Sequence, residues 1–385
     1  MKKLLVVLLS LFTVFTLCGC AEEGGSNTIK IGGSGPLSGG AALYGTAVKN
    51  AAEMAVEEVN ALGGLQFELR IEDDEHNPEK AVTSYGVLKD WGMQVSLSCV
   101  TSKPAEAVSQ DYCDDFIFAL TPSASSASVT LKNANDPGSF YGNVFQMCFN
   151  DPNQGLASAE YISKNGLGTK IAVIYNNEDV YSKGIFEKFS SKAPEVGLEI
   201  VSTGTFTDES DNDFSVQVSK AKEAGAEVVF LPIYYTPASK IFEESKKQDF
   251  APIFFGVDGM DGVLDIEGFD TSLAEGVYLL TPFSADSTEE KSANFTKNYK
   301  ERYGETPNQF AADAYDCVYA LYQACTNANV TPDMSASDIC ELMLSQFTSM
   351  TFEGITGNAT WGRNGEVSKD PKAVIIKNGT YVSAE

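Results

Sequence analysis

Few side chains in this sequence have the type and spacing that catalysis requires. The single histidine, His76, excludes a metal site built on two histidines and leaves little room for Ser-His-Asp or Cys-His chemistry. Beyond residue 20, no two cysteines have the CxxC spacing of zinc or thioredoxin-type sites. These cysteines are Cys99, Cys113, Cys148, Cys317, Cys325 and Cys340. We therefore expect no metal and no cofactor, and we interpret these cysteines as buried free thiols whose pairing, if any, the sequence does not assign.

A glycine-rich stretch at residues 32–40 is a candidate for nucleotide chemistry. Its sequence is Gly-Gly-Ser-Gly-Pro-Leu-Ser-Gly-Gly, and Ser38 stands where the third glycine of a GxGxxG dinucleotide motif would be. A single broken match is a weak signal, and the chain has no P-loop. An extracytoplasmic enzyme with a Rossmann-like lobe is therefore an alternative that these residues disfavour.

Strand and helix patterns alternate along most of the chain. Apolar side chains in residues 43–62 are spaced for one helix face, and two glycines would end that helix. Strands are expected at 28–33, 66–72, 95–97, 116–120, 170–175, 199–206, 228–231, 253–255 and around 373–376. Helices are expected at 43–62, 78–91, 102–112, 151–164, 182–192, 214–224, 237–247, 294–303, 309–326 and 337–346. Strands separated by helices imply right-handed βαβ units, which predicts two α/β halves, each a mostly parallel sheet covered by helices.

The N-terminus has the pattern of a bacterial lipoprotein signal. Lys2 and Lys3 precede an uncharged apolar run at residues 4–17, which is too short for a comfortable membrane span. The run ends in Leu-Cys-Gly-Cys, although Cys18 stands where a smaller residue is more usual. We expect residues 1–19 to be a signal peptide, Cys20 to carry the lipid, and residues 20–27 to form a tether. An ordinary cleaved signal with an incidental cysteine is the alternative.

Length and charge limit the classes of function. Without the expected signal the chain has 366 residues (385 − 19), which is enough for two domains. The formal net charge of −26 argues against nucleic-acid binding, because phosphate contacts need lysine and arginine. It also argues against direct adhesion to anionic lipid. Contact with the membrane is therefore expected through the lipid on Cys20.

An ordered set of motifs resembles the leucine/isoleucine/valine-binding family. The members are solute-binding proteins of branched-chain amino-acid ABC importers. The motifs are PLSGxxAxYG at residues 36–45, Glu58-Val59-Asn60-Ala61-Leu62-Gly63-Gly64, Asp73-Asp74, Asn77-Pro78, Val100-Thr101-Ser102, Thr121-Pro122-Ser123-Ala124-Ser125, Asp151-Pro152-Asn153-Gln154-Gly155, Tyr234-Tyr235 and Gly256-Val257-Asp258-Gly259. The resemblance spans roughly residues 28 to 380, nearly the whole chain beyond the expected signal.

The resemblance implies a type I periplasmic-binding-protein fold. In that fold two Rossmann-like α/β lobes are joined by three crossovers, and the ligand lies in the cleft between them. The expected N-terminal lobe comprises residues 28–149 plus 277–353, and the C-terminal lobe comprises 150–276 plus 354–385. The expected crossovers lie near residue 150, at 276–282 and at 352–357. Such lobes close around a ligand by a hinge motion.

The family pattern also implies how a carboxylate would be held. Ser102 begins a helix after a strand, so its hydroxyl and N–H are expected to bind the carboxylate of an amino acid. Ser125 matches a second hydroxyl donor, and Ser123 matches a position whose carbonyl accepts from the ammonium. A plain N-cap and a serine-rich loop are the alternative interpretations of these three residues.

The same resemblance supplies an anion for the ammonium and aromatic walls for the cleft. Asp258 matches a family glutamate, although aspartate is shorter and a turn aspartate is the alternative. Tyr44, Tyr181 and Tyr234 match cleft aromatics, with Tyr235 as the adjacent alternative to Tyr234. Each tyrosine could instead be half-buried packing.

Two positions depart from the family pattern. The family's archetype has a cysteine where His76 stands, and that cysteine forms a disulfide near the serine turn. The bridge is absent here, which predicts that His76 is a surface turn residue. Ser98 stands where a glycine usually begins the serine turn, so the geometry of that turn is in question.

These resemblances imply a receptor without catalysis. The expected ligand is a small amino acid, first of all leucine, isoleucine or valine. The expected partners are an ABC permease and its ATPase, both on separate chains, and the receptor itself is expected to be a monomer. The alternatives are a sensory module of the same fold and a receptor for an amide or an aromatic acid.

Overall fold

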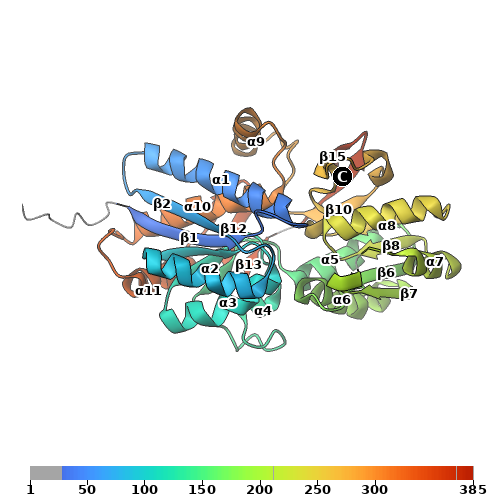
Figure 1. Ribbon diagram of the computed structural model, residues 1–385, viewed down its shortest axis with the longest axis horizontal. Helices are drawn as coiled ribbons and strands as arrows, with labels where there is room; N and C mark the ends of the chain where they lie inside the picture. Colours follow the sequence, from blue (N-terminus) through green and yellow to red (C-terminus); the bar gives the residue numbers. More distant parts are fainter. Residues whose placement is uncertain (1–27, 211, 370, 385) are drawn as a thin grey trace, which may run out of the picture.

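Two α/β lobes lie end to end in the computed structural model, which describes residues 28–210, 212–369 and 371–384 (Figure 1). The first lobe is built on a parallel sheet with strand order β2-β1-β3-β4-β5. Its strands are β1 Ile29–Gly35, β2 Phe67–Asp73, β3 Val95–Cys99, β4 Phe118–Thr121 and β5 Val144–Gln146. Because the strands run parallel, their carboxyl ends meet at one edge of the sheet, which faces the second lobe.

The second lobe has a larger sheet with strand order β15-β14-β10-β9-β8-β6-β7. Its strands are β6 Lys170–Asn176, β7 Glu199–Phe206, β8 Val228–Leu231, β9 Ile253–Gly256, β10 Tyr278–Thr281, β14 Lys372–Lys377 and β15 Thr380–Ser383. Strands β14 and β15 are antiparallel to their neighbours, and the other pairs are parallel. The expected architecture of two mostly parallel α/β lobes is confirmed.

Helices cover both faces of each sheet. Those of the first lobe are α1 Ala42–Ala61, α2 Pro78–Trp91, α3 Ser102–Asp115, α4 Ala127–Thr130, α9 Glu290–Tyr303, α10 Gln309–Asn327 and α11 Ala336–Phe347. Those of the second are α5 Asp151–Lys164, α6 Val180–Lys192, α7 Ser215–Glu223 and α8 Tyr235–Lys247. Short 3-10 turns lie at Ala193–Val196, Asp208–Ser210, Asp258–Met260, Val263–Asp265 and Thr271–Ala274.

Local sequence explains how several of these helices begin, end and pack. The Asn77 side chain accepts hydrogen bonds from the backbone N–H groups of Glu79 and Lys80, so it caps α2 as expected. Gly92 ends α2 with φ = 89°, in the left-handed region that glycine adopts without strain. The apolar stripe predicted for residues 43–62 is the buried face of α1, which packs against α10. Small alanines on that face let the two helices approach closely.

Two of the expected lobe boundaries differ from the structure, although the chain crosses at Thr281, within the expected range of 276–282. Strand β10 pairs with β9 and β14 of the second lobe, so the chain returns to the first lobe after Thr281 and not at residue 277. A small antiparallel sheet of β11 Phe352–Gly354, β12 Gly357–Trp361 and β13 Val367–Ser368 follows. It lies on the first lobe, because the Trp361 indole N–H donates to the Gln146 carbonyl (2.8 Å). The final segment of the second lobe therefore begins near β14 and not at residue 354.

Most cysteine side chains of the described residues lie in the core. The six cysteines expected to be free are free thiols, and all except the half-buried Cys113 are buried. Within residues 28–210, 212–369 and 371–384, no helix has the length and apolarity needed to cross a bilayer. The expected lipid site, Cys20, lies outside the described residues.

A buried ion pair ties the third crossover to α10. The Lys369 side chain is fully buried, and its Nζ donates to Asp313 Oδ1 (2.6 Å) and to Thr356 Oγ1 (2.5 Å). Asp316 accepts the backbone N–H groups of Ile355 and Thr356, each at 2.9 Å. This cluster, which we call the crossover clamp, fixes the chain just before it enters the second lobe.

The Lys369→Met variant tests the crossover clamp. At pH 8 we expect the free energy of unfolding to fall by about 3–5 kcal/mol, because Asp313 and Asp316 would stay buried without their cation. Burial raises the pKa of Asp313 to about 7, above its unfolded value. An acid of this kind lowers the free energy of unfolding increasingly as the pH rises from its unfolded pKa to its folded pKa. The stability that Lys369→Met loses should therefore be smaller at pH 5. Urea unfolding at the two pH values measures this.

Lys377→Met is the matched control, because Lys377 is exposed. We expect its free energy of unfolding to stay within about 0.5 kcal/mol of the unmodified chain. Equal losses for the two variants, or a loss for Lys369→Met that grows toward pH 5, would contradict the crossover clamp.

Candidate ligand-binding site

All seven ligand residues expected from the sequence line one cavity where the lobes meet. Ser102, Ser123, Ser125 and Tyr44 come from the first lobe, and Tyr181, Tyr234 and Asp258 come from the second. Val100, Thr101, Gly259 and Phe310 complete the wall. The free space among them is about 10 Å³, roughly the room that one water molecule needs. A molecule of amino-acid size therefore enters only when the lobes or these side chains move apart.

Two serine hydroxyls of the first lobe face this cavity. Ser102 is the first residue of α3 and is buried, and its Oγ accepts the backbone N–H of Ser126 (3.2 Å). The N–H groups of the first helical turn have no partner within the helix, and the helix dipole favours an anion there. Ser125 Oγ is buried without a hydrogen-bond partner. The two hydroxyls and the start of α3 together form a surface that suits a carboxylate.

The turn before Ser102 keeps its shape although glycine is absent. Ser98 has φ = 53°, the left-handed conformation that glycine would adopt without strain. Its backbone N–H donates to Ser96 Oγ (2.8 Å), which holds this conformation in place. The turn therefore forms with serine at this position. The serine adopts the required geometry at a strain cost of about 1–3 kcal/mol.

Asp258 presents a buried carboxylate from the second lobe. It begins the 3-10 turn after β9, where its carboxylate accepts from the Tyr181 hydroxyl (2.6 Å) and from Gln154 Nε2 (2.8 Å). The Gly259 N–H donates to the same carboxylate at 2.7 Å. A Cβ at Gly259 would collide with the Tyr181 hydroxyl, so this close packing requires glycine. Burial raises the pKa of Asp258 to about 6 in spite of these three donors.

Asp151 is a second buried carboxylate, and sequence reasoning gave it no role. It is the first residue of α5, and its N–H donates to the Ser125 carbonyl (3.0 Å). Neither of its carboxylate oxygens has a partner at hydrogen-bond geometry, although the Ser125 hydroxyl lies near enough to lower its pKa. Burial raises its pKa well above the usual value, and the nearby Asp258 raises it further. No cation is among the groups that shift the pKa of either aspartate. The sequence did contain a signal for this position, because Asp151 begins the Asp-Pro-Asn-Gln-Gly family motif. An acid is common in the first turn of a helix, however, so its type alone does not indicate a ligand role.

The tyrosines close the cavity from both sides. The Tyr44 hydroxyl donates to the Gly259 carbonyl and accepts the Tyr235 N–H (3.2 Å), which joins the lobes directly. The rings of Tyr181 and Tyr234 are stacked, with centroids 4.9 Å apart and an interplanar angle of 4°. Tyr234 therefore lines the cavity, whereas the Tyr235 hydroxyl accepts the Leu43 N–H (3.3 Å) at the start of α1. The structure thus separates the two alternatives that the sequence left open.

His76 is not the surface turn residue that we expected. It does lie in a turn, with φ = 59°, but its ring is half-buried between the lobes. Its Nδ1 lies 2.9 Å from Thr101 Oγ1, and its ring meets the Tyr234 ring edge-on at 5.4 Å between centroids. Burial lowers the pKa of His76 to about 4, so the imidazole is neutral near pH 7. Sequence could not show this burial, because residues from both lobes create it.

Polar contacts around the cavity hold the lobes together. Lys103 Nζ pairs with Asp208 at 3.0 Å, and the Thr236 hydroxyl donates to the Gly40 carbonyl at 2.9 Å. These contacts join α3 to the segment after β7, and the start of α8 to the loop after β1. They involve mostly groups at the carboxyl ends of the strands, where an open α/β sheet binds its ligand.

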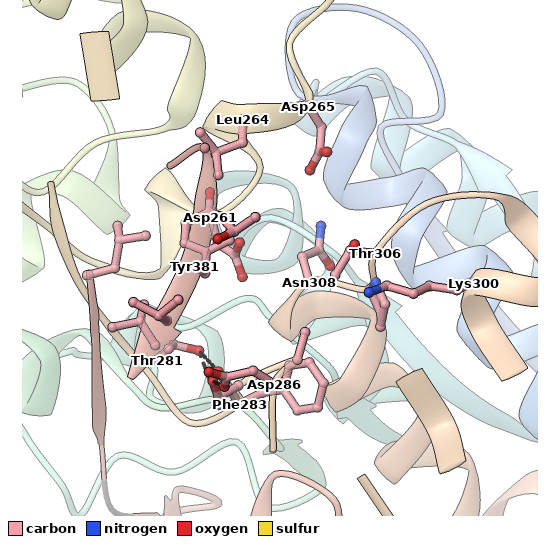
Figure 2. A pocket seen from close by; sticks show the side chains of 18 residues that line it. Asp261, Leu264, Asp265, Thr281, Phe283, Asp286, Lys300, Thr306, Asn308 and Tyr381 are labelled. Atoms are coloured by element: carbon pink, nitrogen blue, oxygen red, sulfur yellow. Dashed lines mark hydrogen bonds between the residues drawn. The ribbon is translucent and has the colours of Figure 1, made fainter. Parts of the chain in front are cut away.

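A second cavity of about 400 Å³ lies on the other side of the Asp258 turn (Figure 2). Acidic side chains line it together with Lys300, but its buried polar groups have protein partners. Asp261 accepts the Gln309 N–H (2.9 Å), and the Tyr381 hydroxyl accepts the Gly262 N–H (3.2 Å). Figure 2 shows the bonds that likewise satisfy Thr281. These contacts serve the packing of the lobes, so the cavity lined by Ser102 and Asp258, with its unpartnered polar groups, is the stronger candidate for a ligand site.

The chain matches known proteins over almost its whole length. A family model described as periplasmic binding protein matches residues 28–379. The Leu/Ile/Val-binding protein homolog 3 of Brucella melitensis is 26% identical over 362 residues, which cover 93% of this chain and 94% of the relative. The leucine-, isoleucine-, valine-, threonine- and alanine-binding protein of Pseudomonas aeruginosa is 25% identical over 371 residues, which cover 95% of each.

Solved structures agree with these sequence matches. The branched-chain amino-acid transporter substrate-binding protein LivJ of Streptococcus pneumoniae, solved with isoleucine, superposes with a TM-score of 0.82 and 26% identity, covering 93% of this chain and 99% of that one. A solute-binding protein of an ABC transporter from R. palustris, solved with benzoate, gives a TM-score of 0.80 at 20% identity, covering 93% and 95%. The second match shows the fold alone.

The Tyr44→Phe variant tests whether the tyrosine hydroxyl holds the lobes together. Phenylalanine keeps the ring but loses both contacts across the cleft, to the Gly259 carbonyl and to the Tyr235 N–H. We expect the population to shift toward separated lobes, and therefore a larger radius of gyration in solution X-ray scattering.

Tyr85→Phe is the control for this variant, because the Tyr85 hydroxyl donates to Asp115 (2.6 Å) within the first lobe. We expect it to leave the radius of gyration unchanged. The same radius for Tyr44→Phe as for the unmodified chain would show that the hydroxyl does not bias closure.

Proposed function

The chain belongs to the periplasmic binding protein family, and on that basis we propose that it is the solute receptor of an ABC importer for an α-amino acid. A periplasmic binding protein binds its solute without converting it, which confirms the interpretation that the chain is not an enzyme. The proposal goes further in naming the class of solute. It also adds a lipid anchor and a transport partner.

The observation that carries this proposal is the pair of buried carboxylates without a cation. Asp258 lines the cavity, and Asp151 is buried behind Ser125, to whose carbonyl its N–H donates; no lysine or arginine is among the groups that shift the pKa of either aspartate. Burying an unpaired carboxylate is costly, and a bound ammonium would offset that cost. On the opposite wall, Ser102, Ser125 and the start of α3 suit a carboxylate. A zwitterion presents both charges at once.

Each expected site residue takes a role in this complex. Ser102 and Ser125 bind the carboxylate of the amino acid through their hydroxyls, and the first amides of α3 assist. Asp258 accepts from the ammonium together with the Ser123 carbonyl, while Asp151 contributes negative potential from below. Tyr44, Tyr181 and Tyr234 cover the ligand and exclude water, which strengthens the polar contacts.

Leucine, isoleucine and valine are the first amino acids to test, because the relatives' names point to them. Val100 and Phe310 supply apolar surface beside the tyrosines for an aliphatic chain. An amide or an aromatic acid is the alternative, and the benzoate complex shares this fold. Such ligands lack an ammonium, so they would leave Asp258 and Asp151 without a cation. That difference favours an amino acid.

Transport follows from closure of the lobes. An open cleft admits the amino acid, and contacts such as Tyr44 to Gly259 form as the cleft closes. The closed receptor then presents surfaces of both lobes to a permease, whose ATPase is a further chain. A monomer leaves these surfaces free. The function is therefore extracytoplasmic capture and delivery.

A lipid on Cys20 would keep the receptor close to that permease. The sequence before the first lobe has lipoprotein character, and residues 20–27 would link the lipid to β1. Eight extended residues reach at most about 26–29 Å. The receptor would therefore stay within roughly its own dimensions of the membrane and still be free to rotate on its tether.

The Asp258→Asn variant tests the ammonium site. Asparagine keeps the shape but loses the charge, so we expect amino-acid binding to weaken by about 2–5 kcal/mol in calorimetric titration. Ser102→Ala should also weaken binding, because it removes a hydrogen bond to a charged group worth about 1.5–3 kcal/mol. Neither change should lower the melting temperature by more than a few degrees.

Asp265→Asn is the matched control, because Asp265 lines the separate cavity of Figure 2. We expect it to bind the amino acid like the unmodified chain. Unchanged affinity in both Asp258→Asn and Ser102→Ala would rule out this site.

The Cys20→Ser variant tests the lipid anchor. Serine has no thiol for lipid attachment, so the protein should move from the membrane fraction to the soluble extracytoplasmic fraction after cell fractionation. Cys18→Ser is the control and should stay with the membranes. Equal membrane retention of the two variants would argue for another means of attachment.

A further inference from the structure

A compartment with acidic walls adjoins the proposed ligand cavity. It has a volume of about 260 Å³ and lies between the lobes. We call it the acidic compartment and define it by Glu75, His76, Asn176, Asp179 and Asp208, which line it. Tyr234 lines both this compartment and the ligand cavity, so one aromatic ring separates them.

The rest of that partition is also made of movable side chains. Thr101 lines the ligand cavity, and its hydroxyl lies 2.9 Å from His76 Nδ1 on the compartment side. The His76 ring meets the Tyr234 ring at 5.4 Å between centroids. Side-chain rotations at these three residues would join the two spaces without a change in the backbone.

A short aliphatic side chain would lie against Val100 and Phe310, but a longer side chain needs more room than the ligand cavity gives. The carboxylate lies toward Ser102 and the ammonium toward Asp258, on different walls of the cavity. The remaining wall includes Thr101 and Tyr234, behind which the acidic compartment lies. A side chain longer than the narrow cavity would therefore extend toward that compartment.

Among the acids of the acidic compartment, Asp179 has a carboxylate oxygen without a hydrogen-bond partner. It is 2% exposed, and its Oδ1 has no hydrogen-bond partner. It occupies the N-cap position of α6, yet its side chain makes no capping hydrogen bond. The backbone N–H groups of Tyr181 and Ser182 lower its pKa, so the carboxylate faces the start of the helix, but Oδ1 stays unpartnered. Burial raises its pKa to about 7, and the neighbouring Asp208 contributes to the shift.

The other two acids of the compartment are already paired. Asp208 accepts from Lys103 Nζ (3.0 Å) and from Asn176 Nδ2 (2.7 Å). Glu75 forms an ion pair with Lys80 near the surface. His76 is neutral near pH 7, so it supplies no positive charge. The buried Asp179 thus lies beside a second carboxylate, and the cation that lowers its pKa, Lys103, is hydrogen-bonded to Asp208 instead.

We propose that the acidic compartment receives the end of the ligand's side chain, and that Asp179 selects a basic amino acid over leucine, isoleucine or valine. This proposal rests on the proposed function and names its substrate class. A side-chain ammonium or guanidinium would donate to Asp179 Oδ1 and balance its charge. An aliphatic side chain would leave that oxygen buried and unpaired, so the compartment discriminates against it.

Calorimetric titration of the purified protein with lysine, ornithine, arginine, leucine, isoleucine and valine tests the proposal. The three basic ligands differ in length, so the panel also covers the reach into the compartment. We expect the best basic amino acid to bind at least about tenfold more tightly than any of the branched-chain ones. In Asp179→Asn, that ligand should bind at least about tenfold more weakly, while leucine should bind at least as tightly as it does to the unmodified chain.

Glu178→Gln is the matched control. It removes the same charge from the neighbouring, exposed position, and we expect all affinities to stay unchanged. Asp179→Asn should also keep or raise the melting temperature, because a neutral amide is easier to bury than a carboxylate. Folding failure of this variant would therefore itself count against an unpaired Asp179.

The remaining outcomes separate this inference from the proposed function. Tighter binding of leucine, isoleucine or valine than of every basic ligand would overturn the inference and leave the amino-acid receptor intact. Equal weakening of lysine and leucine in Asp179→Asn would assign Asp179 a structural role and overturn the inference as well. Binding of no α-amino acid would overturn the proposed function itself.

Discussion

Negative charge buried between the two lobes is the constraint on which the rest of the structure depends. Asp258 and Asp151 lie at the junction with raised pKa values and without a cation, although Tyr181, Gln154 and Gly259 donate to Asp258. Neutral donors offset only part of the cost of removing a carboxylate from water. The closed arrangement is therefore electrostatically incomplete by itself, and a positively charged solute would complete it. In the proposed complex this links recognition to closure, because the charge that would select the ligand would also favour the closed lobes.

The crossover clamp also buries carboxylates, but it neutralises them within the chain. There the chain supplies its own cation, and Lys369 is buried against Asp313 with no exposure of its side chain. A site that contains both charges needs nothing from outside and fixes the backbone in one place. The residues that line the ligand cavity include Asp258 but no lysine or arginine, so this cavity can respond to a solute. The crossover is thus fixed because Lys369 neutralises Asp313, whereas no lysine neutralises Asp258 in the ligand cavity.

The fold was largely predictable because it rests on local periodicity. The predicted helix at residues 151–164 and the predicted strand at residues 199–206 have the bounds of α5 and β7, since each has a clear apolar pattern between turn residues. Strand β10 and the small sheet β11–β13 were missed, because strands of two to five residues carry little periodic signal. Their sheet partners decide where they lie, and the crossover boundaries moved with them.

The site residues also differ in how far local sequence could predict them. Ser102, Ser123, Ser125 and Asp258 follow strands, so an ordered set of motifs placed them, and the structure brings them to one cavity. The ligand role of each stays a prediction. Asp151 and His76 were misjudged because their burial comes from both lobes, which no local pattern records. Contacts made at a junction are a property of two segments far apart in sequence, and a single window of residues does not contain them.

The Tyr44 contact has a consequence for how such receptors diversify. Its hydroxyl spans the cleft to a carbonyl and an amide of the opposite backbone, and Thr236 reaches the Gly40 carbonyl in the same manner. Backbone groups are the same whatever side chains a descendant carries. Closure can therefore be inherited while the walls around the solute change residue by residue. Related proteins can therefore change the solute that they bind while they keep the side-chain to backbone contacts that close the lobes.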